Sequence, residues 1–272
     1  MRTPITRVSP LVSWIDVTSY IPRVDAGQSS PTDLAVAIEA VQAAVRAARE
    51  ARSEPLNPRA KSVAADLVTE ADARAEHAAA AILRRHRPQD GILGEEGTRQ
   101  RGTARRWLID GIDGTVGFAS GLHWCSAVAL EDDQGPAVAA VLDAIVEELH
   151  TARRGVASVN RVRRACPLDD AHVATFLRRD RLVLPGVRDV AHRLLDAAGL
   201  IRHAGPGTLE LTWVAAGRLD AWIQPDVDPW DWHPGALLVT QAGGEARVVE
   251  AETRWHIAGP AELVEELAAL LG

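Results

Sequence analysis

The alternation of apolar and polar residues first becomes regular at residue 32, where the pattern predicts a helix that runs to about residue 49. Thr32 or Asp33 can cap this helix, because either side chain accepts a hydrogen bond from a free backbone amide. The apolar face of the helix would consist of Leu34, Ile38, Val41 and Val45. The preceding residues show no sustained period, so we expect an irregular arm over residues 1–31 and one domain over residues 32–272.

A second helix is predicted after a polar loop at residues 52–65, because Thr69 and Asp72 have the spacing of a capping box. From residue 91 onward, short apolar runs alternate with helical segments. We expect strands at residues 107–109, 124–130, 137–142, 172–177, 220–223, 246–249 and 255–258, and helices at 187–198, 209–216, 234–242 and 261–271. This mixture favours stacked layers of the α/β (α+β) class over an all-α or all-β fold.

Composition and charge narrow the function classes. The 47% hydrophobic and 25% charged shares are those of a soluble globular protein. Thirty Lys and Arg against 37 Asp and Glu give a net charge of −7, which offers no basic field for a nucleic-acid polymer. No run approaches the ~20 apolar residues of a membrane span, and no signal-peptide core precedes Asp16, so we expect a cytoplasmic protein without a membrane partner. The two cysteines, Cys125 and Cys166, lack the spacing of a zinc site.

The chemistry-bearing segment is a short apolar run that leads directly into two carboxylates, Asp110 and Asp113. Gly111 and Gly114 flank them and allow tight turns, so both acids can converge on one cation. Two further acids stand at comparable places: Glu95 after an apolar run and Asp231 at an expected helix start. Oxygen ligands without nearby His or Cys suit Mg²⁺ rather than zinc.

Each acid also has an ordinary structural interpretation. Asp110 and Asp113 can be turn residues, Asp231 a helix cap, Glu95 a solvated charge and Asp72 a member of the capping box. Their shared position at the ends of apolar runs or at helix starts favours a ligand site, because ligand sites are usually built there.

The motifs resemble those of the inositol monophosphatase family of Mg²⁺-dependent, lithium-sensitive phosphatases. The resemblance covers residues 33–271 and includes a Gly-Glu-Glu element at 94–96, Asp-Gly-Ile-Asp-Gly-Thr at 110–115 and Trp-Asp at 230–231. It implies a layered α/β/α/β/α sandwich of the inositol monophosphatase and fructose-1,6-bisphosphatase type, and a homodimer. It also implies hydrolysis of a small polyol or sugar phosphate such as inositol 1-phosphate.

The resemblance also implies roles for the matching residues. Two or three Mg²⁺ ions would be held by Glu95, Asp110, the backbone carbonyl of Ile112, Asp113 and Asp231. The catalytic residues would be Asp72, Thr115 and Glu95, with Asp72 and Thr115 orienting the attacking water. The substrate would be bound by Asp113, Gly114, Thr115, Val116, Gly205, Pro206, Gly207, Gln224 and Lys61, the only lysine of the chain.

Some features depart from the family pattern or leave alternatives open. Gly111 stands where most members have proline, Gln224 where inositol-selective members have glutamate, and His233 follows the Trp-Asp motif at a position usually small and apolar. Haloacid-dehalogenase phosphatases need a second Asp two residues after the first, whereas the spacing here is three. Histidinol-phosphate phosphatase, 3'(2'),5'-bisphosphate nucleotidase and a catalytically silent binding or regulatory homologue remain as alternatives.

Overall fold

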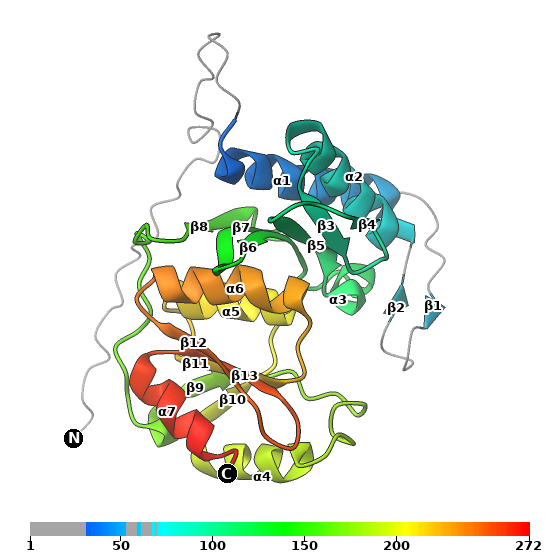
Figure 1. Ribbon diagram of the computed structural model, residues 1–272. Helices are drawn as coiled ribbons and strands as arrows, with labels where there is room; N and C mark the ends of the chain where they lie inside the picture. The colour runs from blue at the N-terminus through cyan, green and yellow to red at the C-terminus, as the bar shows by residue number, and fades with distance from the viewer. Residues whose placement is uncertain (1–30, 53–58, 61–66, 69) are drawn as a thin grey trace, which may run out of the picture.

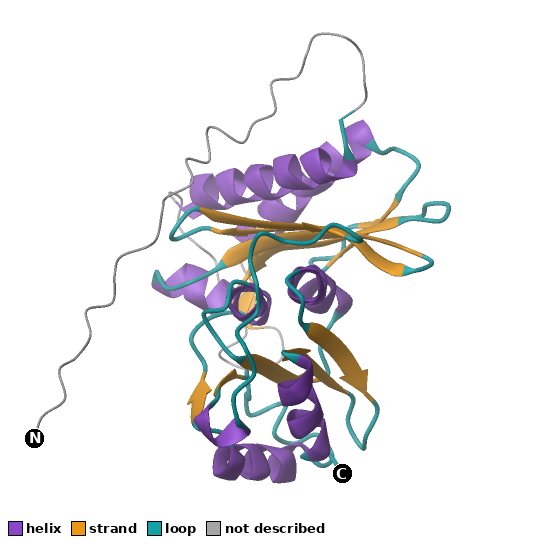
Figure 2. Ribbon diagram, turned by 90° about the vertical axis from the view of Figure 1, so that its left-hand side faces the viewer, coloured by secondary structure: helices purple, strands orange, loops and turns teal. Residues whose placement is uncertain are grey.

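The computed structural model describes residues 31–52, 59–60, 67–68 and 70–272, and these residues form five stacked layers (Figures 1 and 2). A pair of helices covers one face of a six-stranded sheet, and two further helices lie between this sheet and a five-stranded one. The last helices cover the outer face of the second sheet. The expected α/β/α/β/α sandwich is therefore confirmed.

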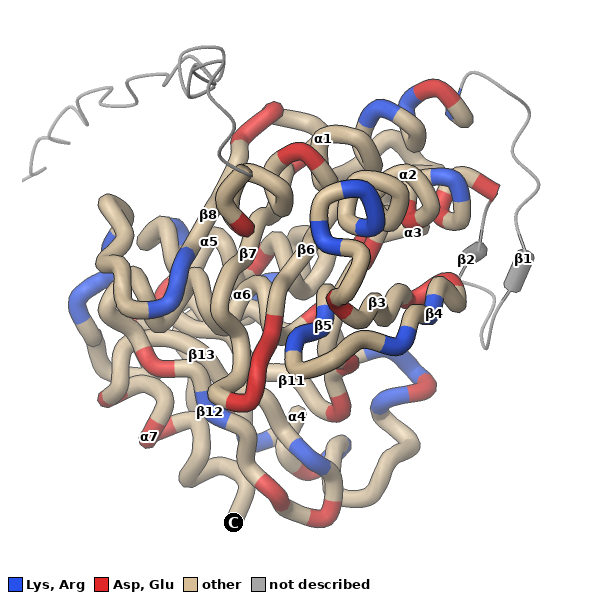
Figure 3. The backbone as a smooth tube through the Cα atoms, turned by 45° about the horizontal axis from the view of Figure 1, so that its top comes forward, with Lys and Arg blue, Asp and Glu red and all other residues tan. Residues whose placement is uncertain are grey.

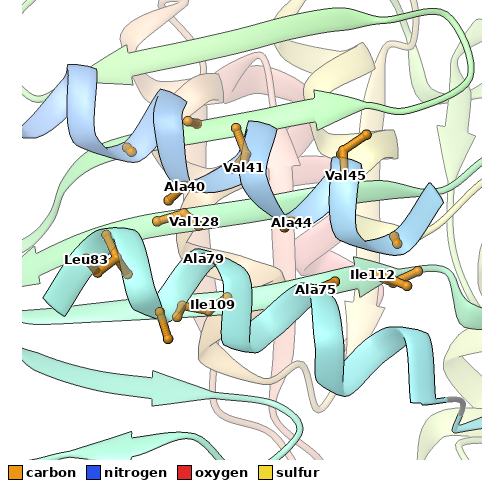
Figure 4. Close-up of a cluster of buried hydrophobic side chains, with 14 of the residues drawn as sticks. Ala40, Val41, Ala44, Val45, Ala75, Ala79, Leu83, Ile109, Ile112 and Val128 are labelled. Carbon is orange, nitrogen blue, oxygen red and sulfur yellow. The ribbon is translucent and has the colours of Figure 1, made fainter. Parts of the chain in front are cut away.

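The outer helices α1 (Asp33–Arg52) and α2 (Glu70–His86) pack through alanine-rich faces. Ala40, Ala44, Ala75 and Ala79 are fully buried, and Figure 4 shows them between the two helices and the sheet residues below. Alanine is the best helix former and has a short side chain, so these faces favour both the helices and their close approach. In this arrangement α2 packs directly against the first sheet.

The first sheet has the order β4 (Arg99–Gln100), β3 (Gly91–Gly94), β5 (Arg106–Asp113), β6 (Cys125–Asp132), β7 (Gly135–Asp143), β8 (Glu148–Arg153). Its pairs are antiparallel except for the parallel pair β3 and β5. The chain ends of β3 and β5 therefore reach the same edge, where the short helix α3 (Thr115–Ser120) begins. A two-stranded pair, β1 (Arg59–Ala60) and β2 (Leu67–Val68), stands apart from both large sheets.

The second sheet has the order β10 (Leu200–Arg202), β9 (His172–Ala174), β11 (Ala221–Pro225), β13 (Trp255–Gly259), β12 (Glu245–Val249). The middle layer consists of α5 (Gly207–Ala215) and α6 (Pro229–Gln241), and Trp222 of β11 stacks on Trp232 of α6 with ring centroids 5.8 Å apart. The outer layer contains α4 (Val187–Ala197), α7 (Ala261–Ala269) and the 3₁₀ turn η2 (Leu168–Asp170). Strands β9, β10 and β11 are mutually parallel. The helices α5 and α6, which follow β10 and β11, therefore begin at the same edge of this sheet.

Several expected boundaries were wrong. The strand expected at 172–177 ends at Ala174, because the chain leaves the sheet there for a loop. The helices expected from residues 209 and 234 begin at Gly207 and Pro229, because the Gly and Pro residues that lowered their helical pattern occupy their first turns. Strands β8 and β10 were not predicted, since both are short edge strands with weak alternation.

Two further observations concern the surface and the arm. Of the helices in the described ranges, none combines the length and apolarity that a membrane crossing requires. In the view of Figure 3, basic and acidic positions alternate over the described elements without a continuous basic face. Residues 1–30 of the expected arm and Lys61 lie outside the described residues.

Candidate functional site

A bulge at the end of β5 brings Asp110 and Asp113 to the same side. Asp110 pairs with Ala127 and Asp113 with Cys125, so three steps on β5 match two steps on β6. In a regular strand, residues three apart point to opposite faces, and the extra residue corrects this. The Asp110 carboxylate is also fixed locally, since its Oδ1 accepts a hydrogen bond of 3.0 Å from the Ile112 amide. The interpretation of Asp110 and Asp113 as turn residues was wrong, because both lie within β5, at its bulge.

Asp231 completes a tight cluster of three carboxylates. One oxygen from each of Asp110, Asp113 and Asp231 lies within 4.8 Å of the others, a spacing that can hold a metal ion. Asp231 lies in the first turn of α6, whose N-cap is Asp228, so the interpretation of Asp231 as the cap was wrong. The first turn of α6 instead places the Asp231 carboxylate beside the bulge of β5.

Glu95 follows β3 and lies next to the cluster. In the parallel pair, Gly94 stands opposite Ile109, and the Glu95 amide donates a 3.2 Å hydrogen bond to the Ile109 carbonyl. Glu95 therefore lies beside Asp110 on the neighbouring strand end. It is not part of the three-carboxylate cluster, but its charge acts on that cluster, as the pKa shifts of Asp110 and Asp231 show.

The electrostatics of the cluster are those of a site built for positive charge. Burial raises the pKa of the Asp110 carboxyl well above its usual range, and the charges of Glu95, Asp113 and Asp231 raise it further. Burial and the charges of Asp113 and Glu95 act in the same direction on the pKa of Asp231. Burial also raises the pKa of Asp113, against hydrogen bonds from Thr208 and Gly114. A cation among these acids would relieve both the repulsion and the cost of burial.

The donor set fits a hard cation such as Mg²⁺. The clustered ligand atoms are all carboxylate oxygens. The only nearby sulfur that the structure describes is Cys125 Sγ, 4.0 Å from Asp113 Oδ2. Burial and the neighbouring carboxylates raise the pKa of the Cys125 thiol, so it stays protonated and is a poor metal ligand.

Asp72 and Thr115 form a second unit beside the acids. Asp72 is buried in the first turn of α2, and its Oδ1 accepts a hydrogen bond of 2.9 Å from the Thr115 hydroxyl. Thr69, the partner in the expected capping box, lies outside the described residues. The side-chain contact to Thr115 joins α2 to the start of α3 at the mouth of β5.

The start of α3 carries the other residues expected near the phosphate. Gly114 is the N-cap and has a φ of 91°, a left-handed conformation that favours glycine. Ile112 is buried, whereas Val116 is 42% exposed. Val116 can therefore contact a ligand through its backbone amide, while its side chain faces solvent. The amides at this helix start have no preceding carbonyl partner in the helix and can receive an anion.

The turn before α5 and Gln224 lie together on the opposite side. A Cβ atom on Gly207 would lie 3.3 Å from Gln224 Oε1, and one on Gly114 would lie 3.1 Å from Pro206 Cγ. The Gly205, Pro206 and Gly207 turn is thus packed between α3 and β11. Gln224 is buried, and its Oε1 has no hydrogen-bond partner among the described residues.

Two residues that position the acids were missed. The Thr208 amide donates to Asp113 Oδ2 at 3.0 Å, and the Thr208 hydroxyl donates to the Asp231 carbonyl at 3.0 Å. Buried Glu76 accepts hydrogen bonds from the amides of Glu96 at 2.6 Å and Thr98 at 2.8 Å, which fixes the loop after Glu95. Glu76 lies one helical turn after Asp72 on the same face of α2, a spacing that could have revealed it.

His233 does not join the acids. Its Nδ1 lies 2.9 Å from Glu131 Oε2 on β6, and burial lowers its pKa in spite of that carboxylate. Its side chain therefore contacts the first sheet rather than the cluster.

The comparisons with known proteins agree with this geometry. The family model of the inositol monophosphatase family matches residues 31–269. The chain belongs to the inositol monophosphatase family. It is 38% identical over 191 residues to an inositol-1-monophosphatase of Rhizobium meliloti strain 1021, with 66% of this chain and 71% of that protein covered.

Other relatives of this family member have different names. The Nus factor SuhB of Escherichia coli K12 is 34% identical over 188 residues, which cover 66% of this chain and 70% of that protein. The crystal structure of the extragenic suppressor protein suhB from Bartonella henselae superposes with a TM-score of 0.79 at 28% identity, covering 87% of this chain and 97% of that one. The family thus includes proteins named as enzymes and proteins named as factors.

Proposed function

We propose that this family member is a Mg²⁺-dependent phosphatase that hydrolyses small polyol or sugar phosphate monoesters such as inositol 1-phosphate. The observation that carries the proposal is the cluster of Asp110, Asp113 and Asp231 with only oxygen donors, next to the Thr115–Asp72 pair. Membership of a phosphatase family supports the reaction class.

The metal would be held by the carboxylates that the sequence and the structure both single out. Asp110, Asp113 and Asp231 are the central ligands, and Glu95 and the Ile112 carbonyl are the further ligands implied by the resemblance. Bound Mg²⁺ lowers the pKa of a coordinated water and neutralises charge on the phosphate. The contribution of the chain is to converge these carboxylates at the bulge of β5 and the first turn of α6.

Thr115 and Asp72 would orient the attacking water. Because the Thr115 hydroxyl donates a hydrogen bond to Asp72, the oxygen of Thr115 can accept a hydrogen bond from a water at the site. A water held in this way presents its lone pair in a defined direction, which supports in-line attack on phosphorus. The amides of Thr115 and Val116 at the start of α3 would receive the phosphate oxygens, next to Gly114, whose amide bonds Asp113.

The alcohol part of the substrate would face the other wall of the site. Gly205, Pro206, Gly207 and Gln224 lie there, and the buried Gln224 Oε1, which has no hydrogen-bond partner among the described residues, would bind a hydroxyl hydrogen once the substrate displaces the turn. A neutral amide binds hydroxyls less strongly than the glutamate of inositol-selective members, since hydrogen bonds to charged groups contribute about 1.5–3 kcal/mol and neutral ones about 0.5–1.5 kcal/mol. We therefore expect broad or shifted specificity, with histidinol phosphate and 3'(2'),5'-bisphosphate nucleotides as the alternative substrates.

A phosphate-release assay tests the reaction class. The purified protein is assayed against inositol 1-phosphate, histidinol phosphate, a 3',5'-bisphosphate nucleotide and sugar phosphates, with Mg²⁺ and with EDTA. Mg²⁺-dependent turnover of at least one ester supports the proposal. Its absence over the whole panel would favour a binding or regulatory homologue, which the relatives named Nus factor SuhB keep as the second candidate.

The substrate side is tested with Gln224→Glu. We expect this variant to raise kcat/KM for inositol 1-phosphate roughly tenfold, because a charged acceptor replaces a neutral one. An unchanged value would show that Gln224 does not contact the substrate. We also propose that the protein is a cytoplasmic homodimer. Light scattering tests the dimer, because it measures the mass of the particle in solution.

A further inference from the structure

Glu210 is a fully buried acid outside the proposed metal and substrate ligands. It lies in the first turn of α5, and its Oε1 accepts hydrogen bonds from the amides of Ala204 at 2.8 Å and Gly205 at 3.1 Å. The N-cap of this helix is Pro206, which has no N–H, so the carboxyl reaches past it to the two preceding amides. Glu210 therefore fixes the turn that leads into α5.

Where this turn enters α5, it contacts the carboxylate cluster. Thr208, the second residue of α5, donates its amide to Asp113 and its hydroxyl to the Asp231 carbonyl. Pro206 packs against Gly114, where a Cβ atom would lie 3.1 Å from the proline ring. A displacement of the turn would thus move the amide that bonds the Asp113 carboxylate and the hydroxyl that bonds the backbone carbonyl of Asp231.

Glu210 is fully buried, although a capping carboxylate can remain exposed to solvent. Among the described residues, no ion pair joins Glu210 to an arginine, and burial, with a smaller effect of Asp113, raises its pKa to about 8, so it is largely protonated at neutral pH. Its Oε2 and the nearby Trp222 indole nitrogen have no hydrogen-bond partner of standard geometry among the described residues. A buried carboxyl with an unsatisfied oxygen costs stability, and a functional role would explain why the chain tolerates it.

We propose that Glu210 is a positioning residue for the metal site: through the amides of Ala204 and Gly205 it holds the turn from which Thr208 fixes Asp113 and Asp231. The proposal rests on the proposed function only in taking this cluster as the metal site. Because the essential feature is an acceptor at Oε1 with the reach of Glu, glutamine should replace it and leucine should not.

The test measures Mg²⁺ binding by titration calorimetry, together with kcat and KM, for wild type, Glu210→Gln and Glu210→Leu. We expect the Gln variant to stay within about threefold of wild type in Mg²⁺ affinity. The Leu variant should bind Mg²⁺ at least ~10-fold more weakly and lose at least ~30-fold in kcat/KM, a loss comparable to that from misplaced catalytic groups. Asp143→Ala is the matched control, since Asp143 is equally buried and accepts hydrogen bonds from the amides of Ile145 and Val146.

The control should lower the melting temperature and leave Mg²⁺ affinity unchanged. If Glu210→Leu behaves like the control, Glu210 is merely structural and the proposal is overturned; equal losses in the Gln and Leu variants would also overturn it. Should Glu210→Leu not fold, Glu210→Asp replaces it, and Mg²⁺ affinity equal to wild type in this shorter acid would refute the positioning role. Lack of phosphatase activity in the wild type would reject the proposed function, while the Mg²⁺ titration would still decide the role of Glu210.

Discussion

The carboxyl groups of Asp113 and Asp231 lie close to each other, and hydrogen bonds from Thr208 hold both residues in place. Substitution of either acid should therefore change catalysis and protein stability in opposite directions. We predict that Asp113→Asn or Asp231→Asn lowers kcat at least ~100-fold at saturating Mg²⁺ and leaves the metal-free melting temperature equal or higher, because burial and the neighbouring acids disfavour the ionised carboxyl that asparagine replaces. Asp228→Asn is the control, since Asn caps a helix as well as Asp does. A variant that keeps more than about a tenth of wild-type kcat, a loss under ~1.4 kcal/mol, contradicts the metal assignment.

The Thr115–Asp72 contact makes a second prediction at the scale of single side chains. Thr115→Val preserves the shape of the side chain but removes the hydroxyl, so kcat should fall at least ~100-fold, and Thr115→Ser should restore it to within about tenfold. Asp72→Asn should also lower kcat at least ~100-fold with little change in melting temperature. If Asp72→Asn instead keeps its turnover and costs about 1 kcal/mol of stability or less, Asp72 is only a capping residue.

Among the elements, the sequence predicted those whose pattern is strong and failed where tertiary contacts decide. The amphipathic helix α1 was predicted from four apolar residues on one face, and β5 from the apolar run before Asp110. The edge strands β8 and β10 carry no comparable alternation and form because a neighbouring strand offers hydrogen bonds.

The site shows the same division. Asp110, Asp113 and Asp231 follow from their place at element ends, whereas Thr208 and Glu76 act through backbone contacts that appear only once α5 and α2 are packed. A sequence pattern shows which residue types can bind a cation, but not which other residues hold those ligands in place.

The close contact of α2 with β5 leads to a prediction about Gly111. A Cβ atom there would lie 2.6 Å from the Glu76 amide nitrogen, against the backbone of α2, which cannot move without displacing Asp72 and Glu76. We predict that Gly111→Ala lowers the free energy of unfolding by about 1–3 kcal/mol and weakens Mg²⁺ binding. Gly91→Ala on β3 is the comparison, since its nearest contact would be 3.3 Å. Denaturant titration of both variants decides this, and equal stabilities would show that α2 is free to shift.

For the whole molecule, the carboxylate cluster lies between the first sheet and the middle layer. Asp110 and Asp113 belong to the first sheet, whereas Asp231 starts a helix of the middle layer that follows a strand of the second. A cation held by all three would tie these layers together, so binding should stabilise the whole fold rather than one loop. Mass action gives about 2.7 kcal/mol of stabilisation at 100 times the dissociation constant for one site.

The pH dependence of stability tests this coupling. Asp110, Asp231 and Glu210 have a raised pKa in the folded protein, so they hold protons that the unfolded chain has already released. Their stabilisation is complete below their unfolded pKa values near 4 and is lost as pH rises, for Glu210 up to about 8. Burial lowers the pKa of His256 from 6.5 to about 4, so His256 destabilises the fold only below pH 6.5 and leaves the window above it to the acids.

Between pH 6.5 and 8, we therefore predict that the metal-free protein loses up to about 1.4 kcal/mol of unfolding free energy per pH unit as Glu210 releases its proton. Saturating Mg²⁺ should raise the stability over this range, because the bound cation favours the ionised forms of Asp110 and Asp231 in the folded state. Glu210→Gln should remove the slope that comes from Glu210, since glutamine does not titrate. Urea titrations at three pH values, with EDTA and with Mg²⁺, measure these slopes. A metal-free stability that is flat or rises over this range would mean that Glu210 is already ionised in the folded protein, and would contradict its raised pKa.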